Sequence, residues 1–245
     1  MNENNTVEKM RRMKLKTMAG LYHQCLNRPD EKSYTTDEFL TLLIDAEWEH
    51  RQKSRIDNLI KQAGFKLVAS SGNIDYQSSR NLDRNVVDRL LTLQFLSNAE
   101  NIIITGPTGS GKSYLAQCLG VQACQMLRRT LYFPTSRFLD NVKLAKLDGT
   151  YSKMIKSIGK APLLILDDFL LTPVEQAGRA ALLDLVEERY DKAATIIATQ
   201  IPVAEWHGLI GESTVADAIL DRLVYSSHRI ELTGESLRKK RTLSA

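Results

Sequence analysis

A strand, a glycine-rich loop and a helix follow one another in the stretch IIITGPTGSGKSYLA, residues 102–116. The β-branched run at 102–104 is typical of a buried strand, and residues 114–127 carry apolar side chains at helical spacing. Between them, GPTGSGKS fits the pattern G-x-x-x-x-G-K-[ST], whose glycines allow positive φ angles so that backbone N–H groups point at phosphates. The helix N-terminus that follows also favours anions. The sequence therefore predicts a phosphate-binding loop between a strand and a helix.

This loop is expected to bind a nucleotide together with Mg²⁺. Lys112 would reach the β- and γ-phosphates, and the Ser113 hydroxyl would ligate Mg²⁺. The predicted nucleotide-binding residues run from the loop into the first helical turn: Gly106, Pro107, Thr108, Gly109, Ser110, Gly111, Lys112, Ser113 and Tyr114.

Length and composition limit the kind of protein that carries this loop. With 245 residues, the chain has room for one large domain or for a core domain plus a smaller one. Its three cysteines, which show no C-x-x-C spacing, are read as reduced thiols of a cytosolic protein. No apolar stretch approaches the roughly 20 residues that span a bilayer, and the N-terminus lacks the apolar segment of a signal peptide. A cytoplasmic protein without a membrane partner is expected.

Residues 1–70 are predicted to form a small helical domain. The periodicity predicts a basic amphipathic helix over residues 7–24, and a turn is expected at residues 27–30. Thr35 and Glu38 fit a capping box that opens a long helix through about Ala63, ended by Gly64. The pairs Glu47–Arg51 and Glu49–Lys53 lie at i,i+4 spacing on this helix, which predicts a solvated outer face.

Strands and helices alternate in residues 71–245, which predicts an α/β domain with a parallel sheet. Strands are expected at residues 102–104, 131–133, 163–166, 195–198 and 228–232. Helices are expected at residues 114–127, 136–146, 151–159, 173–192 and 215–224.

Two adjacent carboxylates end the apolar strand in PLLILDDF, residues 162–169. Ligands of parallel sheets gather beyond the carboxyl ends of the strands, so Asp167 and Asp168 would emerge beside the phosphate loop. Asp167 is expected to hold Mg²⁺ together with Ser113, and Asp168 to orient the attacking water. The simpler alternative is that the pair only caps the next helix.

Three further residues have both a chemical and a structural interpretation. Thr199 and Gln200 end the strand TIIATQ, where either could contact the γ-phosphate or the water, or could only begin a loop. Arg222 lies on a predicted helix, where an ion pair with Asp217 or Asp221 is the simpler interpretation from the residues alone.

The motifs GPTGSGKS, LLILDDF, ATQIPVAEW, ADAILDRLVYSSHRIEL and GESLRKKR follow one another in this order. Together they resemble the IstB family, ATPases that help insertion-sequence transposases and that are similar to DnaC-type helicase loaders. The resemblance implies an AAA+ core preceded by a helical N-terminal region and without a C-terminal lid domain. It also implies that Thr199 is the γ-phosphate sensor and that Arg222 is an arginine finger acting on a neighbouring subunit. Asp167-Asp168 replaces the more usual Asp-Glu, so slow hydrolysis is expected; Arg238 is a weak candidate for a second sensor.

The resemblance further implies a homo-oligomer that binds duplex DNA and a transposase of the same element. The expected DNA contacts are Arg51, Lys53 and Arg55 of the long helix, with more basic residues upstream and the run at 238–241 as a further candidate. Each basic cluster could equally be an ordinary solvated face. The alternative functions are a DnaC-like loader of a replicative helicase and a scaffold in which ATP is only an assembly ligand.

Overall fold

The computed structural model describes residues 3–27 and 34–237. The contacts within the chain divide it into two compact units, Met1–Asn58 and Leu59–Ala245. The domain boundary expected near residue 70 stays a prediction. None of the helices in the described ranges is both long enough and apolar enough to cross a membrane.

The N-terminal unit begins with two short helices, α1 (Glu3–Arg12) and α2 (Lys16–Leu26), where one helix was predicted. That prediction was wrong because Lys14 adopts a left-handed conformation, with φ +62°. The N–H of Lys14 bonds to the carbonyl of Arg11, and the N–H of Leu15 bonds to that of Met10, which closes α1 as a Schellman turn. Glycine usually occupies the left-handed position of such a turn, so a lysine there gives no signal in the sequence.

The long helix α3 spans Thr36–Ala63 and confirms the predicted capping box. The Thr35 N–H donates to Glu38 Oε2 over 2.8 Å, and the Glu38 N–H donates to Thr35 Oγ1 over 3.3 Å. Gly64 follows the last turn with φ +77°, as expected of a helix-ending glycine. Most of the turn expected at residues 27–30 lies outside the described residues.

Glu47 of α3 is buried rather than part of a solvated face. Its carboxylate accepts hydrogen bonds from the N–H groups of Thr17 and Met18 at 3.0 and 3.1 Å, and from Arg51 Nε at 2.9 Å. Burial alone would raise the pKa of Glu47, but these bonds outweigh it and lower the pKa below its ordinary value. Glu47 thus caps the N-terminus of α2, and the expectation of a solvated Glu47–Arg51 pair was wrong.

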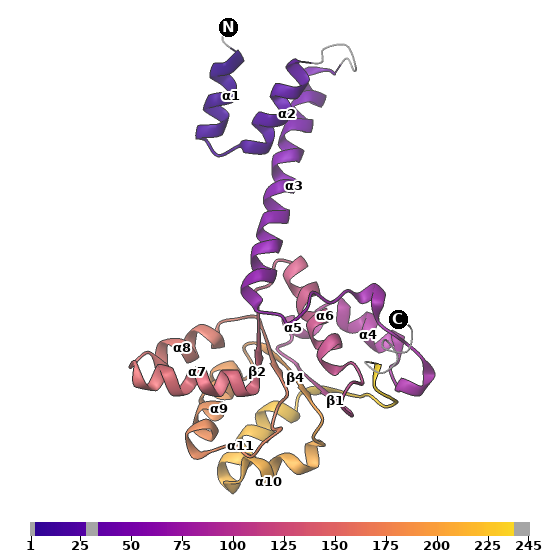
Figure 1. The fold of residues 1–245 in the computed structure, drawn as a ribbon, viewed down its shortest axis with the longest axis vertical. Helices are drawn as coiled ribbons and strands as arrows, with labels where there is room; N and C mark the ends of the chain where they lie inside the picture. Colours follow the sequence, from indigo (N-terminus) through magenta and orange to yellow (C-terminus); the bar gives the residue numbers. More distant parts are fainter. Residues whose placement is uncertain (1–2, 28–33, 238–245) are drawn as a thin grey trace. The chain divides into compact units, whose positions relative to one another are not determined.

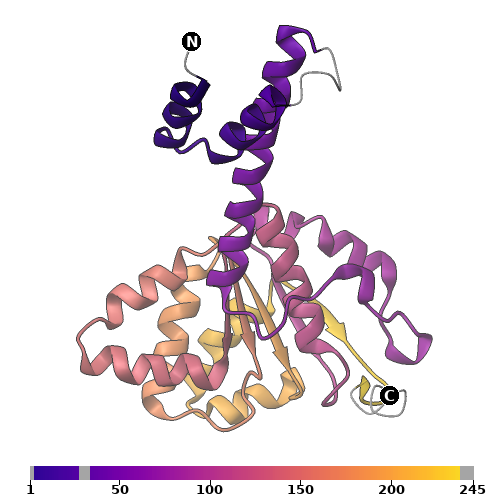
Figure 2. The ribbon, with the colours of Figure 1, turned by 45° about the horizontal axis from the view of Figure 1, so that its top comes forward.

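A five-stranded parallel sheet is the centre of the second unit, as Figures 1 and 2 show. Its strands are β1 (Asn101–Thr105), β2 (Thr130–Pro134), β3 (Leu163–Asp167), β4 (Ala194–Thr199) and β5 (Ser227–Glu231), in the order β2-β3-β4-β1-β5. The register aligns Thr105 with Thr199 and with Glu231, and Asp167 with Ala198. The predicted α/β fold with a parallel sheet is confirmed.

Helices cover both faces of this sheet because both faces are apolar. Ile102 and Ile104 pack toward the side of α6 (Lys112–Gln125), α4 (Arg84–Leu91) and α5 (Gln94–Ser97). Ile103 points to the other side, which is covered by α7 (Thr135–Leu147), α8 (Tyr151–Gly159), α9 (Gln176–Arg189), α10 (Trp206–Ile210) and α11 (Ser213–Val224). Three 3₁₀ turns complete the described elements: η1 (Ser71–Asn73), η2 (Ser78–Arg80) and η3 (Val203–Glu205).

Some helices differ from the prediction, and one of them, α10, depends on tertiary contacts. The predicted helix at 173–192 begins only at Gln176, and α4, α5 and α10 were not predicted. In α10, which has five residues, Trp206 is buried edge-on against Phe169, and its Nε1 donates to Ile201 O over 3.0 Å. A helix this short has little stability of its own, so this packing decides its position.

Candidate nucleotide site

The phosphate loop joins the carboxyl end of β1 to the first residue of α6. Gly106 has φ +144°, and a Cβ added there would lie 2.3 Å from the carbonyl oxygen of Leu232. Only glycine allows the loop to approach the end of β5 so closely. Lys112 begins α6, and its Nζ donates to Pro107 O over 2.8 Å, so the ammonium lies over the loop.

Segments from outside the motif hold this loop in shape. The buried side chain of Arg80 donates to the carbonyl oxygens of Ser110 and Asp75. On the same side, the N–H of Leu237 donates to Gly109 O over 3.0 Å, and the N–H of Thr233 donates to Arg80 O over 3.1 Å. Arg80 therefore joins the phosphate loop to the segment that follows β5.

Ser113 and Asp167, the predicted metal ligands, are brought together. Ser113 Oγ donates to Asp167 Oδ1 over 2.8 Å, and the buried Tyr132 hydroxyl donates to Asp167 Oδ2 over 2.5 Å. Burial, and then the bond to Asp167, raise the pKa of Tyr132, so this phenol remains a donor. A hydroxyl and a carboxylate oxygen, side by side next to the loop, are the hard oxygen ligands that suit Mg²⁺. Among the described residues no group of three or more His, Cys, Asp or Glu side chains could hold a metal ion.

Asp168 differs from its neighbour in conformation and exposure. Its backbone is left-handed, with φ +55°, and its N–H donates to Asp167 Oδ1 over 3.0 Å. The Asp168 side chain is 49% exposed, whereas that of Asp167 is 1% exposed. The two carboxylates thus leave the end of β3 in different directions, one toward Ser113 and one toward solvent.

At the end of β4, Thr199 and Gln200 make different contacts. The buried Thr199 hydroxyl donates to Phe169 O over 2.5 Å and accepts the Ile201 N–H over 3.1 Å, so it joins two loops. Gln200 is exposed, and its Oε1 accepts a hydrogen bond from Thr108 Oγ1 of the phosphate loop over 2.5 Å. Gln200 therefore contacts the loop directly, and the sensor role expected of Thr199 stays a prediction.

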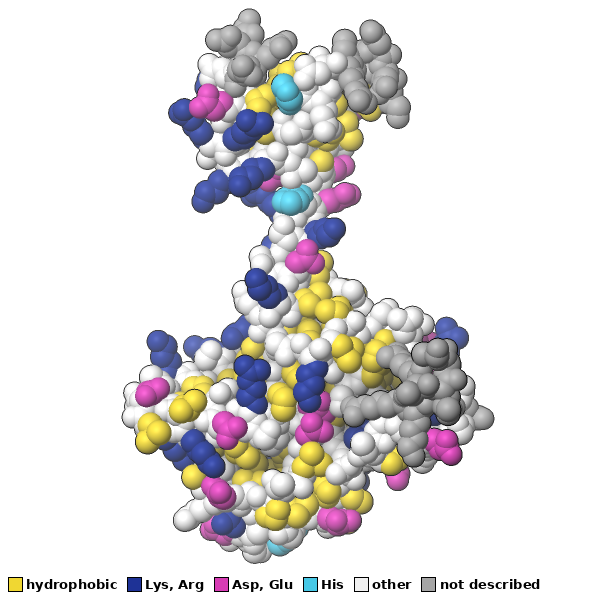
Figure 3. Space-filling model, viewed as in Figure 1, with side chains coloured by type: hydrophobic (Ala, Val, Ile, Leu, Met, Phe, Trp, Pro, Cys, Tyr) yellow, Lys and Arg dark blue, Asp and Glu magenta, His cyan; other side chains and the backbone are white. Residues whose placement is uncertain are grey.

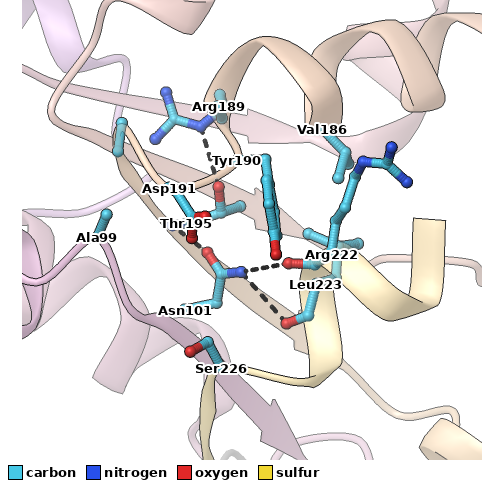
Figure 4. Close-up of a pocket in the computed structure, with 11 residues that line it drawn as sticks. Ala99, Asn101, Val186, Arg189, Tyr190, Asp191, Thr195, Arg222, Leu223 and Ser226 are labelled. Carbon is cyan, nitrogen blue, oxygen red and sulfur yellow. Dashed lines mark hydrogen bonds between the residues drawn. The ribbon is translucent and has the colours of Figure 1, made fainter. Parts of the chain in front are cut away.

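Arg222 lies away from the phosphate loop, in the small pocket of Figure 4. Its guanidinium stacks over Tyr190 at 5.8 Å, donates to Ala218 O over 2.9 Å and pairs with Glu187 at 3.4 Å. Its carbonyl oxygen accepts a bond of 3.1 Å from the side chain of Asn101, the first residue of β1, whereas the phosphate loop follows the last residue of that strand. Arg222 is therefore at the amino edge of the sheet.

The three expected DNA contacts, Arg51, Lys53 and Arg55, are exposed in the N-terminal unit. Figure 3 shows Lys and Arg side chains spread along this unit on the face it displays. Arg51 is also structural, because its Nη2 donates to Lys14 O over 3.1 Å in addition to the bond with Glu47. The run at 238–241, including Arg238, lies outside the described residues.

Pattern reading missed Lys66, Arg80, Gln117 and Tyr132 among the residues around the site. Lys66, Arg80 and Tyr132 lie outside the motifs and reach the site from other segments, whereas Gln117 lies on α6, the helix that follows the phosphate loop. Tyr132 lies in a strand that was predicted, but its position next to the strand that ends in Asp167 comes only from the structure.

The family model described as "IstB-like ATP binding protein" matches residues 8–245. A protein of Sinorhizobium fredii described as an insertion sequence ATP-binding protein is 39% identical, over 96% of this chain and 96% of its own length. The insertion sequence IS21 ATP-binding protein of Pseudomonas aeruginosa is 31% identical, over 94% of this chain and 86% of its own length.

Two solved structures share the fold. The DnaC helicase loader superposes with a TM-score of 0.59 at 17% identity, over 69% of this chain and 98% of its own. AMPPCP-bound DnaA from Aquifex aeolicus also has a TM-score of 0.59, at 18% identity, over 74% of this chain and 56% of its own. The second unit therefore has the α/β fold of the AAA+ P-loop proteins.

The contacts of Arg80 lead to a first prediction. Arg80→Met should weaken ATP binding by about tenfold or more, because the loop carbonyl of Ser110 loses a charge-assisted hydrogen bond worth roughly 1.5–3 kcal/mol. Titration of a fluorescent ATP analogue measures the change, and Arg89→Met, which alters an exposed arginine of α4, is the matched control. Equal affinities of the two variants would show that Arg80 does not shape the loop.

Proposed function

The chain belongs to the family of IstB-like ATP binding proteins, and from this premise we propose that it is a Mg²⁺-dependent ATPase that binds duplex DNA and assists an insertion-sequence transposase. The observation that carries the proposal is the 2.8 Å contact between Ser113 and Asp167 directly beside the phosphate loop. This contact brings a phosphate cradle and a metal-ligand pair into one site, as nucleotide hydrolysis requires.

In the proposed mechanism, the loop backbone and Lys112 hold the phosphates of ATP. Ser113 and Asp167 would hold Mg²⁺, and the ion would supply positive charge that neutralises the phosphate oxygens. Asp168 orients the attacking water and accepts its proton, because its carboxylate is exposed beside the buried Asp167. Gln200, in contact with Thr108, and Thr199 are the two candidates to sense the γ-phosphate.

We further propose that hydrolysis requires a neighbouring subunit. A strand rises about 3.3 Å per residue, so the five residues of β1 separate the amino edge, where Arg222 lies, from the phosphate loop by about 15 Å. This separation supports a role of Arg222 on the nucleotide of another copy of the chain rather than on its own. A trans arginine of this kind contributes about 10³–10⁵ in rate in related phosphoryl transfers.

DNA binding is proposed from the relatives' insertion-sequence names and from the exposed cations of α3. Contacts with phosphates need only correctly placed cations, so binding with little sequence preference is expected. A DnaC-like helicase loader is the alternative function, but the likeness to DnaC at 17% identity concerns the fold alone. Pull-down with the transposase and with a replicative helicase distinguishes the two.

Nucleotide hydrolysis is tested by separating binding from turnover. Lys112→Ala should weaken ATP affinity by about tenfold or more, because a charge-assisted contact is lost. Asp168→Asn should bind ATP normally yet hydrolyse it about 100-fold more slowly, because an amide cannot accept the proton of water. Isothermal titration and phosphate release measure the two effects, with Asp148→Asn, an exposed carboxylate after α7, as the control. Normal turnover by Asp168→Asn would remove it from the mechanism.

The subunit requirement is tested by mixing two inactive variants. Arg222→Ala subunits keep their own phosphate loop, and Lys112→Ala subunits keep their own arginine. Each alone should show little ATPase activity on DNA, whereas the mixture should regain activity wherever an intact loop meets an intact arginine. Normal activity of Arg222→Ala alone, or activity per subunit that does not depend on protein concentration, would contradict a trans role.

The DNA surface is tested without disturbing the cap of α2. Replacing Lys53 and Arg55 with Ala should weaken binding equally on all duplex sequences, and should lower the slope of log affinity against log salt by about two. Arg51 is left in place because it holds Glu47. Fluorescence anisotropy at several salt concentrations measures binding, and Lys160→Ala with Lys192→Ala removes the same charge elsewhere as a control. Equal losses in both double variants would mean that only net charge matters.

A further inference from the structure

Lys66 lies beside both carboxylates at the end of β3. Its Nζ is 3.4 Å from Asp168 Oδ2 and 3.9 Å from Asp167 Oδ2, and it lies 5.9 Å from the ring centre of Tyr132. The residue comes from the segment just after α3, far from every motif of the sequence. It therefore brings a positive charge to the site from a part of the chain that nucleotide-binding patterns do not cover.

The segment carrying Lys66 is fixed to the helix that follows the phosphate loop. The N–H groups of Lys66 and Leu67 both donate to Oε1 of the buried Gln117, at 2.7 and 3.1 Å. Gln117 Nε2 in turn donates over 3.0 Å to the carbonyl oxygen of Ser113, the predicted metal ligand. A buried amide thus couples the backbone of Lys66 to the first turn of α6.

Two further contacts hold the same segment in place. The Tyr114 hydroxyl donates to Ser70 O over 2.9 Å, and the ring of Phe65 packs against that of Tyr132 at 6.2 Å. The backbone around Lys66 is consequently anchored at several points, and only the end of the side chain, which is 51% exposed, extends to the carboxylates. The backbone of Lys66 is thus held more firmly than that of a surface lysine on a loop without such contacts.

We propose that Lys66 is a positioning residue of the hydrolytic site, an inference that rests on the proposed ATPase function. Its ammonium holds Oδ2 of Asp168, which leaves Oδ1 directed at the attacking water. Its charge also offsets that of the carboxylate pair, so it opposes the binding of a divalent cation at Asp167. Lys66 thus improves the orientation of Asp168 while weakening metal binding.

Removing the charge of Lys66 should therefore slow hydrolysis but tighten metal binding. Lys66→Met should lower kcat about tenfold or more with little change in KM, because Asp168 loses its orienting partner. The same variant should bind Mn²⁺, used as a spectroscopic substitute for Mg²⁺ in the ADP complex, about threefold or more tightly. Lys66→Arg keeps the charge and should resemble the wild type in both measurements.

The experiment measures steady-state ATPase kinetics and Mn²⁺ affinity by electron paramagnetic resonance. Lys153→Met, which removes an exposed lysine of α8, is the matched control, and thermal melting confirms that every variant folds. A lower kcat with unchanged Mn²⁺ affinity, or an equal loss in Lys66→Arg, would overturn the proposal in favour of a packing role. Tighter Mn²⁺ binding with unchanged kcat would also overturn it. A wild type that hydrolyses no ATP would contradict the proposed function, whatever the result for Lys66. In that case, unchanged Mn²⁺ affinity of Lys66→Met would also exclude the electrostatic effect of Lys66.

Discussion

Parallel pairing of β1, β3 and β4 is the constraint on which the candidate site depends. Because the three strands run in one direction, the phosphate loop, the aspartate pair and Thr199 all emerge at the same edge of the sheet. The same constraint places Arg222, whose helix precedes β5, at the other edge. The proposed phosphate site and Arg222 therefore lie at opposite edges of one sheet, and they do not meet within a single subunit.

The phosphate loop depends on more than its own sequence. Its carbonyl groups are held by Arg80 from the segment before α4 and by Leu237 after β5. Gly106 lies against Leu232 and Gly111 lies against Arg80, and at both positions a Cβ would clash with that neighbour. Neighbouring segments therefore supply hydrogen bonds that help to set the curvature of the loop.

The parts of the fold predicted correctly are those with a local physical signal. The apolar strands, the glycine pattern and the Thr35–Glu38 capping box are set by neighbouring residues, and each is found in the structure. The break between α1 and α2 was not predicted, because Lys14 adopts a left-handed backbone conformation that is usual for glycine.

The predicted site residues Ser113 and Asp167 meet because the first turn of α6 lies beside the end of β3, whereas no sequence pattern indicates their partners. Lys66, Arg80 and Tyr132 reach the site through tertiary packing, and a lone lysine, arginine or tyrosine has no periodicity that could reveal it. The role of Glu47 was likewise not predictable from the sequence. Its spacing to Arg51 fits a surface ion pair, but its carboxylate caps another helix, α2.

The hydrogen bond from Tyr132 to Asp167 has a consequence for ion selectivity. The phenol donates to Oδ2, and Oδ1 accepts from Ser113 and from the Asp168 N–H, so hydrogen bonds hold both oxygens of this carboxylate in place. Calcium prefers six to eight oxygen ligands and often takes both oxygens of a carboxylate, whereas magnesium keeps a compact octahedral shell with single oxygens and water. Bidentate binding of an ion would disturb the hydrogen bonds on both oxygens, so the tyrosine on the neighbouring strand would help to disfavour the larger ion.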